Sequence, residues 1–252
     1  MLPILLHDEH LIAIHKPAGL LVHRSELDRH ETRFAVQLLR DQIGQHVYPV
    51  HRLDKGTSGV LLFALDRATA ATLSRQFEEQ AVRKRYVAVV RGHPEAVGRI
   101  DHPLSRRRDE AERRPHALAD APQPALTDFT RLATIELPWA IDRYPSSRYA
   151  LLEPVPRTGR RHQLRRHMKH IAHPIIGDSS FGKGVHNRRF QQSLGSHRLL
   201  LACVEMRLEH PFSKAPITLT APLSDDFALL LERLGWSSAL PGDWRSTAVA
   251  RG

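Results

Sequence analysis

The sequence predicts an α+β fold built on a mixed or antiparallel sheet. Short apolar runs typical of strands are mixed with a few helical segments, and the two do not alternate as they would in a parallel α/β protein. Of the 252 residues, 41% are hydrophobic and 25% are charged, which is the composition of a globular protein rather than of a coiled coil or a collagen. A chain of this length can bury a substantial core in one large domain or two small ones.

The N-terminal segment predicts a strand hairpin followed by a turn. Apolar runs at 4–6 and 11–14 flank a polar group, which is the pattern of two short strands joined by a tight connection. Residues 16–19, Lys-Pro-Ala-Gly, form a turn signal. A short strand at 20–22 and a helix at 32–43 are expected to follow.

A buried strand and a capped helix are predicted next. Residues 60–65 are continuously apolar, and Asp66 is placed to cap a helix that reaches about Gln80. Later elements are a strand at 86–90, two further strands at 148–153 and 198–208, and a short helix at 225–234.

The domain organisation that we expect is a single domain over residues 1–236. From 105 to 124 apolar residues nearly vanish, which predicts an exposed insertion rather than a linker between domains. Residues 237–252 are rich in Ser, Pro and Gly and are interpreted as a C-terminal tail.

The charge balance favours a polyanionic partner. Lys and Arg number 37 against 27 Asp and Glu, a formal net charge of +10. The single cysteine, Cys203, excludes an internal disulfide and a multi-thiolate zinc site. No secretory signal and no run long enough to span a membrane are recognisable, so we expect a cytoplasmic protein without a membrane partner.

The positive charge is concentrated between residues 156 and 170. Six of these fifteen residues are Arg or Lys, and no acid follows before Asp178. If a helix begins near His162, then Leu164, Met168 and Ile171 face the core, while Arg161, Arg165 and Lys169 form a polar ridge at i,i+4 spacing. An ordinary solvated helix face would carry interspersed acids, so contact with nucleic acid is favoured.

Three other motifs are interpreted as structural. Four histidines between 162 and 173 have no acid or thiol close by in sequence, and we expect no metal site. Residues 177–184 resemble a phosphate-binding loop, but Gly184 stands where magnesium binding needs Ser or Thr. Residues 56–59 lack the glycine that a serine nucleophile elbow requires, because Val60 occupies that position.

Asp54 is the acid most suggestive of chemistry. It lies between His51, Arg52 and Lys55, cationic or potentially cationic groups that favour an ionised carboxylate. From the residues alone, a catalytic role and a role as a turn cap remain equally open.

Four motifs in order resemble the RluA family of pseudouridine synthases. They are His-Arg-Leu-Asp at 51–54 with Thr-Ser-Gly at 57–59, the basic-x-Tyr strand at 84–86, Gly-Arg-Arg-His-Gln-Leu-Arg at 159–165, and His-Pro-Ile-Ile-Gly-Asp at 173–178. The resemblance extends from about residue 2 to 236.

The resemblance implies the pseudouridine synthase fold, a central mixed, mostly antiparallel sheet with flanking helices and an RNA-binding cleft. It implies that Asp54 attacks C6 of the uracil or C1′ of the ribose. Arg165 would pair with Asp54, Tyr86 would stack on the extruded base, and Arg52 would fill the gap left in the RNA. The isomerisation is redox-neutral, so no cofactor is expected.

Two stretches, at 21–25 with 41–46 and at 122–125 with 131–134, are more similar to a family member that acts on tRNA. The implied target is a uridine in tRNA, at position 65 of the T arm; a ribosomal RNA uridine, or RNA binding without catalysis, are the alternatives. We expect a monomer with no protein partner. The further RNA-binding residues that we expect are His51, Lys84, Arg160, Arg161, Arg166 and Lys169.

Two departures from the family pattern are visible in the sequence. Many relatives carry an N-terminal RNA-binding S4 domain, whereas here the catalytic region begins at the first residues. The family often has Leu-His-Ala late in the chain, where residues 200–203 here read Leu-Leu-Ala-Cys.

Overall fold

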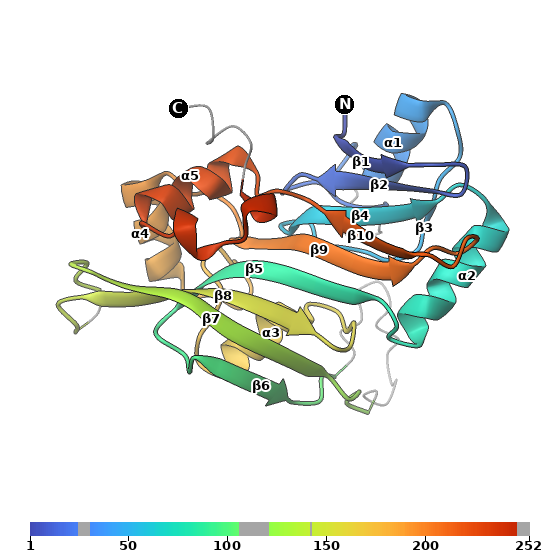
Figure 1. Cartoon of the computed structure of the whole chain (residues 1–252). Helices are drawn as coiled ribbons and strands as arrows, with labels where there is room; N and C mark the ends of the chain where they lie inside the picture. Colours follow the sequence, from blue (N-terminus) through green and yellow to red (C-terminus); the bar gives the residue numbers. More distant parts are fainter. Residues whose placement is uncertain (25–30, 106–120, 142, 246–252) are drawn as a thin grey trace, which may run out of the picture.

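A computed structural model describes residues 1–24, 31–105, 121–141 and 143–245 and confirms the α+β class (Figure 1). The described strands form one open sheet in the order β1-β2-β4-β9-β5-β8-β7-β6, with β3 beside β4 and β10 beside β9. The strands are β1 (Ile4–His7), β2 (Leu11–Lys16), β3 (Tyr48–Pro49), β4 (Ser58–Ala64), β5 (Arg83–Arg91), β6 (Val97–Asp101), β7 (Leu126–Leu137), β8 (Ser147–Pro156), β9 (Leu201–Glu209) and β10 (Pro216–Thr220). The helices are α1 (Ala35–Ile43), α2 (Arg67–Glu78), α3 (Gln163–His170), α4 (Gly184–Leu194) and α5 (Asp225–Arg233), and short 3-10 turns span Ser237–Ala239 and Gly242–Trp244.

The sheet is mixed but mostly antiparallel, as predicted. Among the described strands, the pairing of β4 with β9 is parallel and the other ladders are antiparallel. These two strands lie with β5 at the centre of the sheet (Figure 1). The N-terminal strands therefore join the rest of the sheet through β4 and β9.

Both faces of the sheet are covered, as the alternating side chains of β5 show. Tyr86, Ala88 and Val90 pack into a core with α1, α2 and α3, whereas Val87 and Val89 pack into a second core with α4 and α5. Because successive side chains of a strand point to opposite faces, one strand contributes to both cores.

Local signals explain where the first elements begin. The side chain of Asp8 accepts the backbone N–H groups of His10 and Leu11, which closes the β1–β2 hairpin. Asp66 caps α2 as predicted, because its carboxylate accepts the N–H of Thr69 at 2.8 Å.

Several elements differ from the prediction. The strand expected at 20–22 is reduced to a single bridge between Leu21 and Phe34, and α1 begins at Ala35 because Phe34 is extended. Strands β6, β7 and β10 and helix α4 were not predicted. Most residues of β6 and β7 are exposed or only partly buried, and neither strand has a long apolar run. Of the insertion expected at 105–124, residues 106–120 lie outside the described part. Leu104, just before the insertion, forms an isolated bridge with Gln123 near its end.

The C-terminal segment is packed up to residue 245, which corrects the expected tail. Leu240 and Trp244 are buried in the second core, and Leu223 donates its N–H to the Trp244 carbonyl at 2.9 Å. The Trp244 ring lies 4.3 Å from the Arg85 guanidinium carbon. The fold therefore extends beyond the boundary predicted at residue 236.

His51 holds the loop before β4 against the sheet. Its Nε2 accepts the backbone N–H of Leu62 at 2.9 Å, and its ring stacks on Phe77. Burial, with a smaller contribution from Lys84, lowers the pKa of His51 to about 3. The native fold thus requires the neutral imidazole.

None of the helices that the structure describes is long and apolar enough to cross a membrane.

We expect Trp244→Ala to lower the free energy of unfolding by about 3–5 kcal/mol, because it empties a large buried site. Phe212→Ala is the matched control, since the Phe212 ring is exposed. Urea denaturation followed by circular dichroism measures both changes. Equal, small effects of the two substitutions would show that the C-terminal segment adds nothing to the core.

The pKa of His51 also predicts an acid-dependent loss of stability. The unfolded chain binds the His51 proton below about pH 6.5 and the native state only near pH 3, so the free energy of unfolding falls as pH falls between these values. Between pH 7 and pH 5 the loss is about 2 kcal/mol. In His51→Gln, whose amide oxygen can accept the same bond without titrating, this part of the slope should vanish; an unchanged slope would contradict the assignment.

Candidate active site

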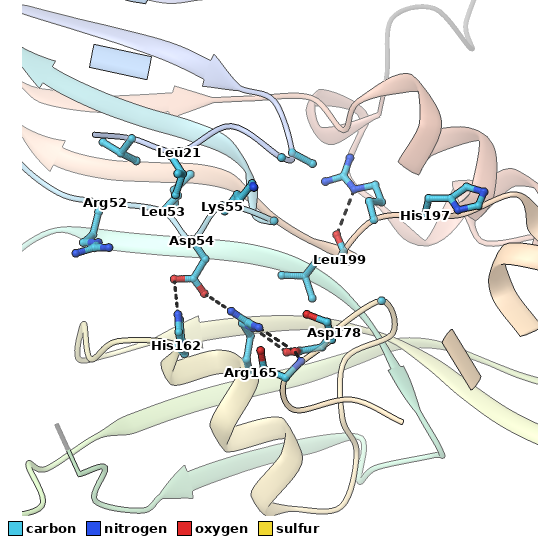
Figure 2. Close-up of a pocket in the computed structure, with 18 of the residues that line it drawn as sticks. Leu21, Arg52, Leu53, Asp54, Lys55, His162, Arg165, Asp178, His197 and Leu199 are labelled. Atoms are coloured by element: carbon cyan, nitrogen blue, oxygen red, sulfur yellow. Dashed lines mark hydrogen bonds and ion pairs between the residues drawn. The ribbon is translucent and has the colours of Figure 1, made fainter. Parts of the chain in front are cut away.

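Asp54 lies in the loop between β3 and β4. Its carboxylate lies beside Arg165 of α3 and His162, the residue immediately before this helix (Figure 2). Its Oδ2 accepts a bond from Nη1 of Arg165 at 3.2 Å, and its Oδ1 lies 3.7 Å from Nε2 of His162. The local turn is made by the backbone, since the Asp54 carbonyl accepts the N–H of Thr57 at 3.0 Å. The carboxylate is thus oriented towards the Arg165 guanidinium and the His162 imidazole, and it keeps 25% of its side-chain surface exposed.

Helix α3 presents Arg165 to this loop. Leu164 and Met168 are buried on the core side, as predicted, and Arg165 is turned inward with 11% of its side chain exposed. The predicted outward ridge is therefore corrected: Arg161 precedes the helix and Arg165 faces two carboxylates. The residue at the helix start, His162, has a left-handed φ of 55°.

Asp178 is the second acid on Arg165. The guanidinium donates from Nε to Oδ2 at 2.7 Å and from Nη2 to Oδ1 at 2.8 Å. Burial opposes the charge of Arg165, but its bonds to Asp178 and Asp54 raise its pKa above the ordinary value. Burial also opposes the charge of Asp178, and Arg165 with two backbone N–H groups lowers its pKa nevertheless.

The sheet register brings Tyr86 to the same place. Cys203 in β9 pairs with Gly59 of β4 on one side and with Tyr86 of β5 on the other. Gly59 has φ +110°, and a Cβ there would lie 2.0 Å from the Cys203 carbonyl oxygen, so the close strand approach requires glycine. Asp54, five residues before Gly59, therefore lies near Tyr86.

Tyr86 and Asp54 both line a cavity of about 300 Å³. Burial, reinforced by Cys203, raises the pKa of Tyr86 well above its ordinary value, so the phenol stays neutral. Lys84 also lines this cavity and lies 5.5 Å from the Phe77 ring centroid; burial lowers its pKa. A neutral aromatic ring beside a carboxylate suits a planar, uncharged ligand.

Asp54 also lines a larger cavity of about 740 Å³ (Figure 2). Segments 18–23, 161–165 and 195–199 contribute to its walls. Arg52 is exposed and lines both cavities, as does Asp54 itself. Asp54 therefore belongs to the walls of both cavities, together with Arg52 and Arg165.

Of the other basic residues expected to bind RNA, four line the two cavities, whereas Arg166 and Lys169 do not. Lys84, His51 and Arg160 line the smaller cavity, and Arg161 lines the larger one. Arg160 donates to the Pro124 carbonyl, and Arg166 donates to Ser105. Lys169 is exposed farther along α3, 5.9 Å from the Phe181 ring centroid.

Two residues close to Asp54 or its partner Arg165 were not singled out from the sequence. Asp178 was noted only within a motif. Lys16 was interpreted as part of a turn, but it is fully buried, and its Nζ donates to the carbonyls of Pro17, Leu20 and Lys55 at 2.9, 2.6 and 3.2 Å. Burial lowers the pKa of Lys16 to about 7, although Asp54 opposes the shift. The sequence did contain a signal for this burial, because Lys16 lies two residues after the buried Ile14 and therefore on the same face of β2.

The three motifs interpreted as structural are engaged in the fold. His167 bonds Thr127 and the His102 carbonyl, and within the described ranges no three His, Cys, Asp or Glu side chains converge as metal ligands. In the 177–184 turn, the N–H groups of Ser180 and Phe181 donate to the Asp178 carboxylate, and that of Gly177 donates to Asn187. The Ser58 hydroxyl is buried and accepts a bond from Arg198 at 2.6 Å.

Comparison with known proteins agrees with this geometry. The family model described as RNA pseudouridylate synthase matches residues 10–170. The chain is 48% identical to tRNA pseudouridine synthase C of Pasteurella multocida, over 93% of this chain and 97% of that protein. It is 47% identical to the protein of the same name from Haemophilus influenzae, over 94% of this chain and 100% of that protein.

Solved structures show the same fold. Human RNA pseudouridylate synthase domain containing 4 has a TM-score of 0.67 at 26% identity, with 92% of this chain and 93% of that chain covered. Human RNA pseudouridylate synthase domain containing 1 has a TM-score of 0.65 at 28% identity, with 88% and 84% covered. Together with the family match, which spans more than half of the sequence, these similarities show that the chain belongs to the RluA-type RNA pseudouridylate synthase family.

Proposed function

We propose that this protein isomerises uridine to pseudouridine in tRNA, with Asp54 as the nucleophile. The observation that carries the proposal is the position of the Asp54 carboxylate, which lies between Arg165 and a small pocket that contains Tyr86. The names of the similar bacterial proteins support tRNA as the substrate class.

The reaction rearranges bonds without oxidation or reduction. The Asp54 carboxylate attacks C6 of the uracil or C1′ of the ribose, and the N1–C1′ glycosidic bond breaks. The base turns, a C5–C1′ bond forms, and the bond between Asp54 and the nucleoside breaks, which regenerates the carboxylate. The proton on C5 leaves and N1 gains one. Atoms and electrons balance without an electron carrier, so the reaction needs no cofactor.

Tyr86 and Arg52 suit the handling of an extruded nucleotide. A base in a helix must leave its stack before Asp54 can reach it. The neutral ring of Tyr86 offers a stacking surface in the small cavity, and the exposed Arg52 at the rim can occupy the vacated space. Because Tyr86 stays protonated, we assign it to stacking rather than to proton abstraction at ordinary pH.

The position that we propose is uridine 65 in the T arm, acted on by a cytoplasmic monomer. The resemblance to a tRNA-acting family member supports the position. Exposed cations around the cleft, Arg52 and Lys169 among them, support contact with the phosphates of a folded RNA.

Asp54→Asn should abolish turnover, because an amide cannot replace the carboxylate as nucleophile. We expect tritium release from transcribed tRNA carrying 5-tritiated uridine to fall at least about 1,000-fold. Asp41→Asn, a change on the exposed α1 surface, is the control and should keep full activity. Turnover retained in Asp54→Asn would refute the nucleophile; activity absent from the wild type on every RNA tested would refute the enzyme assignment in favour of RNA binding alone.

Mapping pseudouridine in total RNA from a deletion strain tests the target. The expected result is loss of the modification at position 65 of tRNA, restored by the wild-type protein and not by Asp54→Asn. A loss confined to ribosomal RNA would refute the tRNA assignment.

Binding of tRNA should weaken steeply with salt, because phosphate contacts release counterions. We expect Lys169→Ala to reduce the slope of log Kd against log salt by about 0.7–0.9, one contact's worth. Arg40→Ala on α1 should leave the slope unchanged, since Arg40 is paired with Asp41 on another surface. A flat salt response of the wild type would contradict phosphate contact.

A further inference from the structure

Arg165 is shared unequally between two carboxylates. Asp178 takes the Nε and Nη2 edge of the guanidinium in two short bonds, 2.7 and 2.8 Å. Asp54 takes a single bond from Nη1 at 3.2 Å, longer than charge-assisted bonds of this kind usually are. The stronger hold on Arg165 therefore comes from Asp178.

Asp178 is itself held rigidly. Its side chain is fully buried, and its Oδ1 also accepts the N–H groups of Ser180 and Phe181, both at 2.9 Å. Its backbone carbonyl accepts bonds from Asn187 and Gly182. The Phe181 ring lies 5.1 Å from the Arg165 guanidinium carbon, which limits movement of the arginine.

We propose that Asp178 is a positioning residue for the reaction: it fixes one edge of Arg165 so that Nη1 alone is offered to Asp54. The inference rests on the proposed function of Asp54 as nucleophile. A carboxylate held by one long bond can turn its lone pair to carbon, whereas a carboxylate held by both edges of an arginine would have to break two bonds first.

The arrangement also preserves charge balance during the reaction. When Asp54 bonds to the nucleoside, its carboxylate loses its negative charge. A largely buried Arg165 without another partner would then be an uncompensated cation, which is costly. Asp178 keeps Arg165 neutralised throughout. Other charged or titratable groups around Asp54 include Arg52 and Lys55 in its own loop, His162, Lys16 from β2 and Tyr86 from β5.

Asp178→Asn is the direct test. Its amide oxygen can keep the bonds to Ser180 and Phe181, but its NH₂ group would face the Nε–H of Arg165 and release that edge. We expect kcat for tritium release to fall about 10- to 100-fold through misplacement of Arg165, with KM little changed. Asp8→Asn is the matched control, because Asp8 also accepts two backbone N–H groups and pairs with a basic residue, His210, and it should keep wild-type kcat.

A double-mutant cycle separates positioning from a general structural role. If Asp178 acts through Arg165, the double variant Asp178→Asn, Arg165→Lys should be no slower than Arg165→Lys alone. Multiplied losses in the double variant, or wild-type kcat in Asp178→Asn, would overturn the proposal while leaving the function of Asp54 intact.

A measurement independent of turnover decides the case if Asp178→Asn does not fold. In ¹⁵N NMR spectra, with the signal assigned by its absence in Arg165→Lys, the Nε–H of Arg165 should exchange slowly in the wild type. It should remain protected in Asp54→Asn, because Asp178 holds that edge. Loss of protection in Asp54→Asn would overturn the proposal, whereas an inactive wild type with a protected Nε–H would refute only the proposed function.

Discussion

The position of the Asp54 loop beside Tyr86 depends on the close approach of Gly59 in β4 to Cys203 in β9. This contact forms the parallel junction that joins the N-terminal strands to the rest of the sheet. A side chain at residue 59 would collide with the Cys203 backbone, so the junction requires glycine at this position. Because Tyr86 pairs with Cys203 from the other side, the same junction places the Asp54 loop near the Tyr86 ring.

The electrostatics of the cleft are arranged around Arg165. Two acids from distant parts of the chain share one guanidinium, whose planar fork can serve both. Asp178 is fully buried and is satisfied by Arg165 and backbone N–H groups, whereas Asp54 keeps part of its surface exposed. The buried pair of Asp178 and Arg165 thus fixes the position of the guanidinium, and the partly exposed Asp54 stays accessible to a ligand.

Much of the fold was predictable because its signals are local. The hairpin of β1 and β2, the apolar run of β4 and the Asp66 cap of α2 each depend on neighbouring residues. Strands β6, β7 and β10 were missed because these partly exposed strands have no continuous apolar run. Their hydrogen-bonded pairing with neighbouring strands defines them instead. Trp244 was assigned to a tail for a related reason: its short, polar surroundings hide a side chain that packs against residues far away in sequence.

The sequence by itself determined the charge of the protein, the core face of α3 and the candidacy of Asp54, since composition, helical period and motif order can be read along the chain. From the residues alone, the sequence did not decide whether Asp54 caps a turn or acts in catalysis. Only the tertiary structure showed the Asp54 carboxylate turned to Arg165, the second hold of Asp178 on that arginine, and the buried Lys16 beneath the loop. These contacts join residues separated by 111, 13 and 39 positions, respectively, so strand register and helix docking decide them rather than local sequence.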